Sequence, residues 1–183
     1  MAQRHQIEIT AYHEAGHAVM AMSTGLLVTE ISCLASDNGH GHTAWMMPLF
    51  MTDASRVGAV LTLASGMAAD YLHWSSLVER DEQELSMGHA GDRSDARVHL
   101  AALGHGEVFD DYLSLAIDHL RKPEVWPFVV TFAELLKITG LVNGQDIFHR
   151  TMQCVPKISE QELELFKRAV DRKYGDQLEQ HQS

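Results

Sequence analysis

The sequence predicts a mainly α protein of the α+β class, in which a small β-hairpin or sheet lies beside a helix that carries two histidines. Three observations predict this class. Apolar residues recur with helical spacing, only two segments are interpreted as strands, and no segment is long and apolar enough to span a bilayer. We expect a single domain over residues 1–175, followed by a disordered polar tail at 176–183.

Helix and strand signals alternate in the N-terminal half of the chain. Thr10 is a candidate N-cap for an apolar helix, and Gly25 is well placed to end it. Thr52 or Asp53 can cap a second helix, whose apolar residues repeat every 3.6 positions. Two strand-like segments lie between these helices, separated by a turn-forming Ser-Asp-Asn-Gly stretch. The expected elements are a helix at 10–24, strands at 27–34 and 41–47, and a helix from 52 or 53 to 72.

The C-terminal half is predicted to be helical after a polar loop at residues 75–91. Gly104-His105-Gly106 separates the first two helices, and Pro123 precedes the third. Ser159-Glu160-Gln161-Glu162 has the pattern of a capping box and predicts the start of the last helix. The expected helices are at 94–103, 107–121, 124–138, 144–153 and 159–173.

Composition narrows the class of protein before any motif is considered. The formal net charge of −11 argues against nucleic-acid binding through a phosphate-contacting face. The two cysteines, Cys33 and Cys154, have no C-x-x-C spacing and predict neither a disulfide framework nor a cysteine zinc cluster. No secretory signal pattern is present at the N-terminus. We therefore expect a cytoplasmic protein with no membrane span.

The most informative motif is His13-Glu14-Ala15-Gly16-His17, within the first predicted helix. Histidines at positions i and i+4 lie on one face of a helix, so both imidazoles can bind one Zn²⁺. Glu14 is then placed to act as a general base on water at the metal. The helix around the motif is apolar and therefore buried, and buried imidazoles need partners, which zinc would supply.

A catalytic zinc site also requires a third protein ligand and an open position for water. A metzincin would have glycine at position 20 and histidine at 23, whereas this chain has Met20 and Ser23, so that class is excluded. Position in the sequence alone does not select the third ligand. The downstream candidates are Asp70, His89, Asp92, Asp95 and His99.

The motif and four later segments follow one another in an order that suggests a family. The segments are Ala11-Tyr12-His13-Glu14-Ala15-Gly16-His17-Ala18-Val19, a hairpin ending in Gly41-His42-Thr43-Ala44-Trp45-Met46-Met47-Pro48, Ser65-Gly66-Met67-Ala68-Ala69-Asp70-Tyr71-Leu72, Gly91-Asp92-Arg93-Ser94-Asp95-Ala96, and Gly140-Leu141-Val142-Asn143-Gly144-Gln145-Asp146-Ile147. Over about residues 8–150 they resemble the peptidase domain of the FtsH family of ATP-dependent zinc proteases, standing alone without the ATPase module.

The resemblance implies a zincin-like helical peptidase domain with His13, His17 and Asp95 as zinc ligands and Glu14 as the catalytic base. Asp92 is the leading substitute for Asp95, and His99 is a candidate neighbour of the site. The chain has no G-x-x-x-x-G-K-[ST] loop and so no P-loop ATPase of its own. We therefore expect ATP-independent cleavage of peptides or unfolded protein segments, with a homo-oligomer or a separate ATPase as possible partners.

Two other hypotheses remain open at this stage. The chain can be a zinc-containing module that binds or regulates another protein and has little hydrolytic activity. The intact Glu14 argues against this, because a purely structural zinc site needs no base. Alternatively, the chain is an unrelated zincin, such as an ImmA-like repressor-cleaving peptidase, that shares only the H-E-x-x-H helix. In that case the third ligand and the fold would differ.

Overall fold

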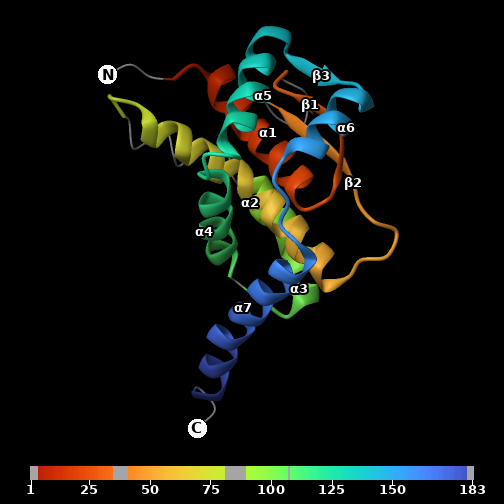
Figure 1. The fold of residues 1–183 in the computed structure, drawn as a ribbon. Coiled ribbons are helices and arrows are strands. Elements are labelled where there is room, and N and C mark those ends of the chain that lie inside the picture. Colours follow the sequence, from red (N-terminus) through yellow and green to blue (C-terminus); the bar gives the residue numbers. More distant parts are fainter. Residues whose placement is uncertain (1–3, 35–40, 81–89, 107, 181–183) are drawn as a thin grey trace.

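The computed structural model describes residues 4–34, 41–80, 90–106 and 108–180 and confirms a mainly α fold with a small antiparallel sheet (Figure 1). Within these residues the elements are α1 (Gln6–Ser23), β1 (Leu27–Ser32), β2 (His42–Met46), α2 (Asp53–Ser76), α3 (Ala90–Leu103), α4 (Phe109–Leu120), α5 (Trp126–Thr139), β3 (Leu141–Asn143), α6 (Gln145–Cys154) and α7 (Glu160–Gln180). None of the helices in the described ranges has the length and apolar character that crossing a membrane requires.

Helix α1 is the centre of the fold, and it packs against α2, α5 and the sheet. It begins at Gln6, so Thr10 lies inside the helix and is not the predicted N-cap. Residues 6–9 (Gln-Ile-Glu-Ile) continue the helical pattern upstream, which explains the earlier start. Gly25 has a φ of 86° and follows the last helical turn, which confirms its predicted position at the helix end.

The crossing of α1 and α2 is unusually close because small residues face each other there. A Cβ placed on Gly16 of α1 would lie 2.5 Å from the Ser65 carbonyl oxygen and 2.6 Å from Cβ of Ala69, both on α2. Glycine at this position therefore lets the two backbones approach. The start of α2 agrees with its predicted cap, because the Ser55 amide donates to the Thr52 hydroxyl.

The predicted hairpin forms two strands of a three-stranded sheet with the order β2-β1-β3. β1 pairs antiparallel with both neighbours, and β2 occupies an edge of the sheet. In the β1–β2 register Thr43 lies opposite Ile31. The sequence does not predict the third strand, because Leu141–Asn143 is only three residues long and has little strand pattern of its own. The predicted turn at 36–39 lies outside the described residues.

The boundaries of two predicted elements shift in ways that matter for the site. α2 continues to Ser76, and α3 begins at Ala90, four residues before its predicted start. The predicted loop at 75–91 is therefore helical at both ends, while residues 81–89 lie outside the described ranges. The earlier start of α3 places Asp92 in its first turn.

The last helix confirms its predicted cap and exceeds its predicted length. The Ser159 amide donates to the Glu162 carboxylate at 2.7 Å, and the Glu162 amide donates to the Ser159 hydroxyl at 3.2 Å, as a capping box requires. The helix was expected to end at residue 173, but the backbone of α7 is helical to Gln180. Residues 176–180 (Asp-Gln-Leu-Glu-Gln) contain good helix formers, which the prediction of a polar tail did not weigh.

Candidate metal centre

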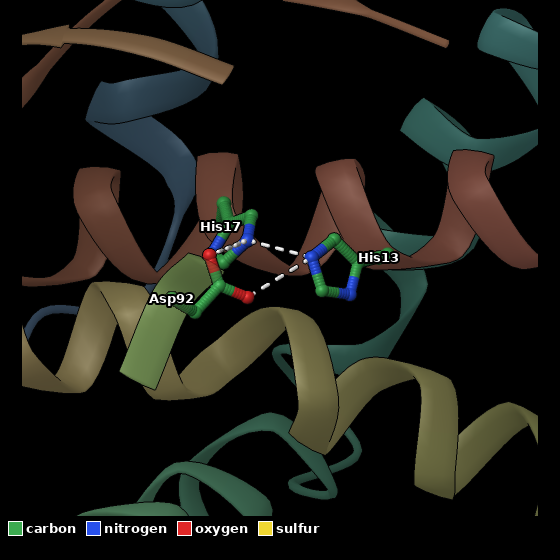
Figure 2. Close-up of side chains that lie close together, drawn as sticks. All are labelled: His13, His17 and Asp92. Atoms are coloured by element: carbon green, nitrogen blue, oxygen red, sulfur yellow. Dashed lines mark hydrogen bonds and ion pairs between the residues drawn. The ribbon is translucent and has the colours of Figure 1, made fainter. Parts of the chain in front are cut away.

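The two histidines of the motif converge as their spacing predicts. His13 and His17 project from the same face of α1, and their Nε2 atoms are 3.0 Å apart (Figure 2). The rings are nearly perpendicular, with centroids 4.6 Å apart. His17 is buried, whereas His13 is partly exposed. Two nitrogen donors therefore point at one position beside the helix.

The carboxylate that meets these nitrogens belongs to Asp92 of α3. Its Oδ2 lies 3.2 Å from Nε2 of His13, and its Oδ1 lies 3.4 Å from Nε2 of His17. Ligand atoms of the three side chains all lie within 4.8 Å of one another, close enough to hold one metal ion. Of the described residues, only these three form such a group. The structure therefore brings Asp92, and not Asp95, to the two histidines.

The direction of α3 explains why Asp92 and not Asp95 reaches the histidines. The buried face of this helix carries Ala96, Leu100 and Leu103. Asp92 precedes Ala96 by four residues and lies on that face, whereas Asp95 is exposed to solvent. The sequence contained this signal in the spacing of the apolar residues. With a predicted helix start at residue 94, however, Asp92 lies outside the helix, so this spacing does not connect Asp92 with the buried face.

The imidazole of His17 is oriented by a backbone carbonyl of α2. Its Nδ1 lies 2.7 Å from the Thr62 carbonyl oxygen and can donate a hydrogen bond to it. That hydrogen bond leaves the lone pair on Nε2, the atom that faces Asp92 and His13. Zinc-binding histidines are commonly held in this way by an outer acceptor.

Gly66 of α2 provides the space in which the two imidazoles meet. A Cβ placed on Gly66 would lie 2.5 Å from Nε2 of His17 and 2.6 Å from Cε1 of His13. Such distances are too short for real contacts, so a side chain at this position would displace the rings. The local sequence predicted neither this role of Gly66 nor that of the Thr62 carbonyl, because both depend on how α2 crosses α1.

The electrostatics of the three side chains suit a cation. Burial lowers the pKa of His17, but the Asp92 carboxylate, the negative charge of Glu14 and a backbone carbonyl together act in the opposite direction, so the pKa rises to about 9. Burial raises the pKa of Asp92, yet its two histidine neighbours hold that pKa well below the usual range. Oδ2 of Asp92 is buried and lies 3.2 Å from Nε2 of His13. A metal ion bound between the three side chains would displace the proton that this pairing keeps on His17, and the Asp92 carboxylate would balance part of the charge of the ion.

Glu14 lies next to the metal-binding side chains but faces the sheet. Its side chain is buried with 6% exposed, and one carboxylate oxygen, Oε2, accepts a hydrogen bond from the Thr43 hydroxyl of β2 at 2.8 Å. The negative charge of Glu14 contributes to the raised pKa of His17, so the two groups act on each other across the site. The sequence predicted the position of Glu14 but not its contact with β2.

The other candidates for a third ligand lie apart from this group. Asp70 is fully buried and forms an ion pair with Arg4, with 2.6 Å between Oδ1 and Nη1. His99 lies further along α3, and burial and the nearby Arg56 lower its pKa. It does not belong to the group of residues that can hold a metal. His89 lies outside the described residues.

Comparison with known proteins does not place the chain in a family: neither the models of known protein families nor the curated proteins match it. The class of protein must therefore be inferred from the site. The site has two histidines one helical turn apart, a carboxylate from a second helix and a glutamate beside the first histidine, and it is a candidate metal centre.

Proposed function

We propose that this protein is a zinc-dependent metalloendopeptidase that hydrolyses peptide bonds in peptides or unfolded protein segments without using ATP itself. The convergence of His13, His17 and Asp92 next to Glu14 carries the proposal. A site with two histidines and one carboxylate is typical of catalytic zinc, which binds three protein ligands and keeps one position open. A structural zinc site would have a fourth protein ligand, and among the described residues no fourth ligand joins the group.

The residues fit zinc in several respects. Imidazole nitrogen and carboxylate oxygen are ligands that zinc prefers. The Thr62 carbonyl leaves the lone pair of His17 facing the site, and Gly66 leaves room for both rings. When bound there, zinc would act as a Lewis acid that lowers the pKa of water towards about 7 and polarises a carbonyl group.

The protein's own groups then have distinct roles in hydrolysis. His13, His17 and Asp92 would hold the metal, and Asp92 would also balance part of its charge. Glu14 accepts the proton of the attacking water on its carboxylate and delivers it to the nitrogen of the leaving amine. Because its side chain is buried, water competes little with this transfer.

The choice of a peptide bond rests on the resemblance to FtsH-like peptidase domains. The zinc motif, the hairpin and the aspartate-bearing segment occur in this chain in the order of that family. We propose Asp92 as the third ligand in place of Asp95, three residues earlier in the same segment. Assembly into a homo-oligomer, or cooperation with a separate ATPase, belongs to the same proposal.

Activity of the purified, zinc-loaded protein tests the proposal. Hydrolysis of a quenched peptide library and of unfolded casein would be compared between the wild type and Glu14→Gln. We expect the variant to retain zinc and to lose about 10²- to 10⁴-fold in kcat, the usual contribution of a general base. Glu134→Gln serves as the matched control, because it removes an exposed carboxylate of α5.

The outcomes separate the enzyme from the binding module. Activity in the wild type and in Glu134→Gln, with loss in Glu14→Gln, supports the peptidase. Bound zinc without activity above that of Glu14→Gln on any substrate would refute it and favour the regulatory module.

A further inference from the structure

We propose that Thr43 is a positioning residue for Glu14, and that strand β2 thereby sets which carboxylate oxygen acts as the base. The inference rests on the proposed peptidase function. It concerns the contact between the edge strand of the sheet and the glutamate of α1, which the H-E-x-x-H motif does not specify.

The contact consists of two short distances from one hydroxyl. Oγ1 of Thr43 lies 2.8 Å from Oε2 of Glu14 and 2.9 Å from the backbone carbonyl oxygen of the same residue. A threonine hydroxyl has one proton, so it donates fully to one of these oxygens at a time. In both cases the strand is tied to the helical turn that carries the catalytic glutamate.

Gly41 completes the arrangement on the other side of the carboxylate. A Cβ placed on Gly41 would lie 2.9 Å from Oε1 of Glu14, and 2.5 Å from Cγ2 of Thr10. Glycine at this position therefore avoids a clash with Oε1. Thr43 of β2 thus places a hydroxyl beside Oε2 of Glu14, and Gly41, which directly precedes β2, lies beside Oε1.

This arrangement has a chemical consequence. A carboxylate that accepts one hydrogen bond on Oε2 keeps both lone pairs of Oε1 free, which favours Oε1 as the proton acceptor. The hydrogen bond also removes rotational freedom from the Glu14 side chain before substrate binds. After proton uptake, the Thr43 hydroxyl can turn to the backbone carbonyl oxygen of Glu14, which lies at nearly the same distance.

The anchoring of β2 makes Thr43 a suitable point of support. Thr43 pairs with Ile31 of β1, which is fully buried, so the strand position is fixed by the core. A group held by packed secondary structure positions its partner better than one on a free loop.

The experiment compares three variants of the full chain loaded with zinc. Thr43→Val keeps the shape and removes the hydroxyl, and Thr43→Ser keeps the hydroxyl. Thr29→Val is the matched control, because Thr29 is a half-buried threonine of β1 whose hydroxyl donates to the Ala44 carbonyl, away from Glu14. For each variant we would measure kcat and KM on one peptide substrate, together with zinc content and melting temperature.

We expect Thr43→Val to lower kcat by about tenfold to a hundredfold, since small misplacements of catalytic groups have effects of this size. Its KM should change less than about twofold and its zinc content should be unchanged, because both hydrogen-bond contacts of the hydroxyl are with Glu14. Thr43→Ser should retain most of the activity, and Thr29→Val all of it.

Three results would overturn the inference. Wild-type kcat in Thr43→Val would show that Glu14 needs no such support. A Thr43→Ser variant as impaired as Thr43→Val would assign the effect to packing. If the wild type and Glu14→Gln are equally inactive, the proposed peptidase function fails and the role of Thr43 fails with it. The first two results, in contrast, would overturn only the role of Thr43 and would leave the proposed peptidase function standing.

Discussion

Gly66 and His17 approach so closely that a Cβ on the glycine would lie 2.5 Å from Nε2 of the histidine. This relationship links the packing of α2 on α1 directly to the chemistry of the site. A Cβ on Gly66 would displace Nε2 of His17, which is the atom proposed to bind the metal. The metal affinity should therefore depend on Gly66, although Gly66 itself provides no ligand atom.

The Gly66→Ala variant should therefore bind zinc more weakly. We expect a loss of about tenfold to a hundredfold, comparable with the loss of an outer-shell partner. Competition with a chromogenic chelator measures the affinity. Gly91→Ala is the control, because a Cβ there meets nothing within 4 Å although Gly91 is next to Asp92. Equal affinity in the two variants would mean that the imidazoles do not meet at Gly66.

Zinc should also raise the melting temperature, because the site joins α1 to α3 only in the folded state. At a free zinc concentration one hundred times the dissociation constant, the stabilisation is about 2.7 kcal/mol. For a protein of this size that corresponds to roughly 5–10 °C. Thermal unfolding with zinc and with a chelator would show the shift. It should be absent in His17→Ala, and a shift of the same size in that variant would place the bound zinc elsewhere.

His119 should make folding sensitive to acid. Its imidazole is buried and its Nε2 lies 3.0 Å from the Ser23 hydroxyl. Burial lowers the pKa of His119 to about 4, and nearby Lys122 acts in the same direction, whereas Glu162 opposes it. The folded state thus holds the imidazole neutral at a pH where the unfolded chain, with a pKa of about 6.5, takes up a proton.

The sign of the effect follows from this difference. Stability from this residue is complete above about pH 6.5 and is lost as the pH falls towards 4, by up to about 3 kcal/mol. Urea unfolding of the wild type and of His119→Gln at pH 7.5 and 5 measures it. The wild type should lose more stability than the variant between these pH values. Parallel losses would show that the imidazole is protonated in the folded state.

The sequence was most informative where a few neighbouring residues determine the outcome. The H-E-x-x-H spacing placed His13 and His17 on one helical face, and the Ser159–Glu162 capping box marked the start of α7. Both depend on interactions within about one helical turn. The mainly α class followed from similar local periodicity.

Features that depend on packing between distant segments were not predicted. The approach of Asp92 to the two histidines depends on the first turn and the buried face of α3, and this helix begins four residues before its predicted start. The three-residue strand β3 has little pattern of its own and forms because β1 offers it a partner. The contacts of Thr43, Thr62 and Gly66 with the site arise only when β2 and α2 pack on α1.

The most direct test of the central claim is the zinc affinity of Asp92→Ala compared with that of Asp95→Ala. If Asp92 is the third ligand, its removal should weaken zinc binding by more than about a hundredfold, the upper range for an outer-shell partner. Asp95→Ala should bind zinc as the wild type does, since Asp95 is exposed on α3. Loss of zinc in Asp95→Ala with unchanged affinity in Asp92→Ala would contradict the site described here.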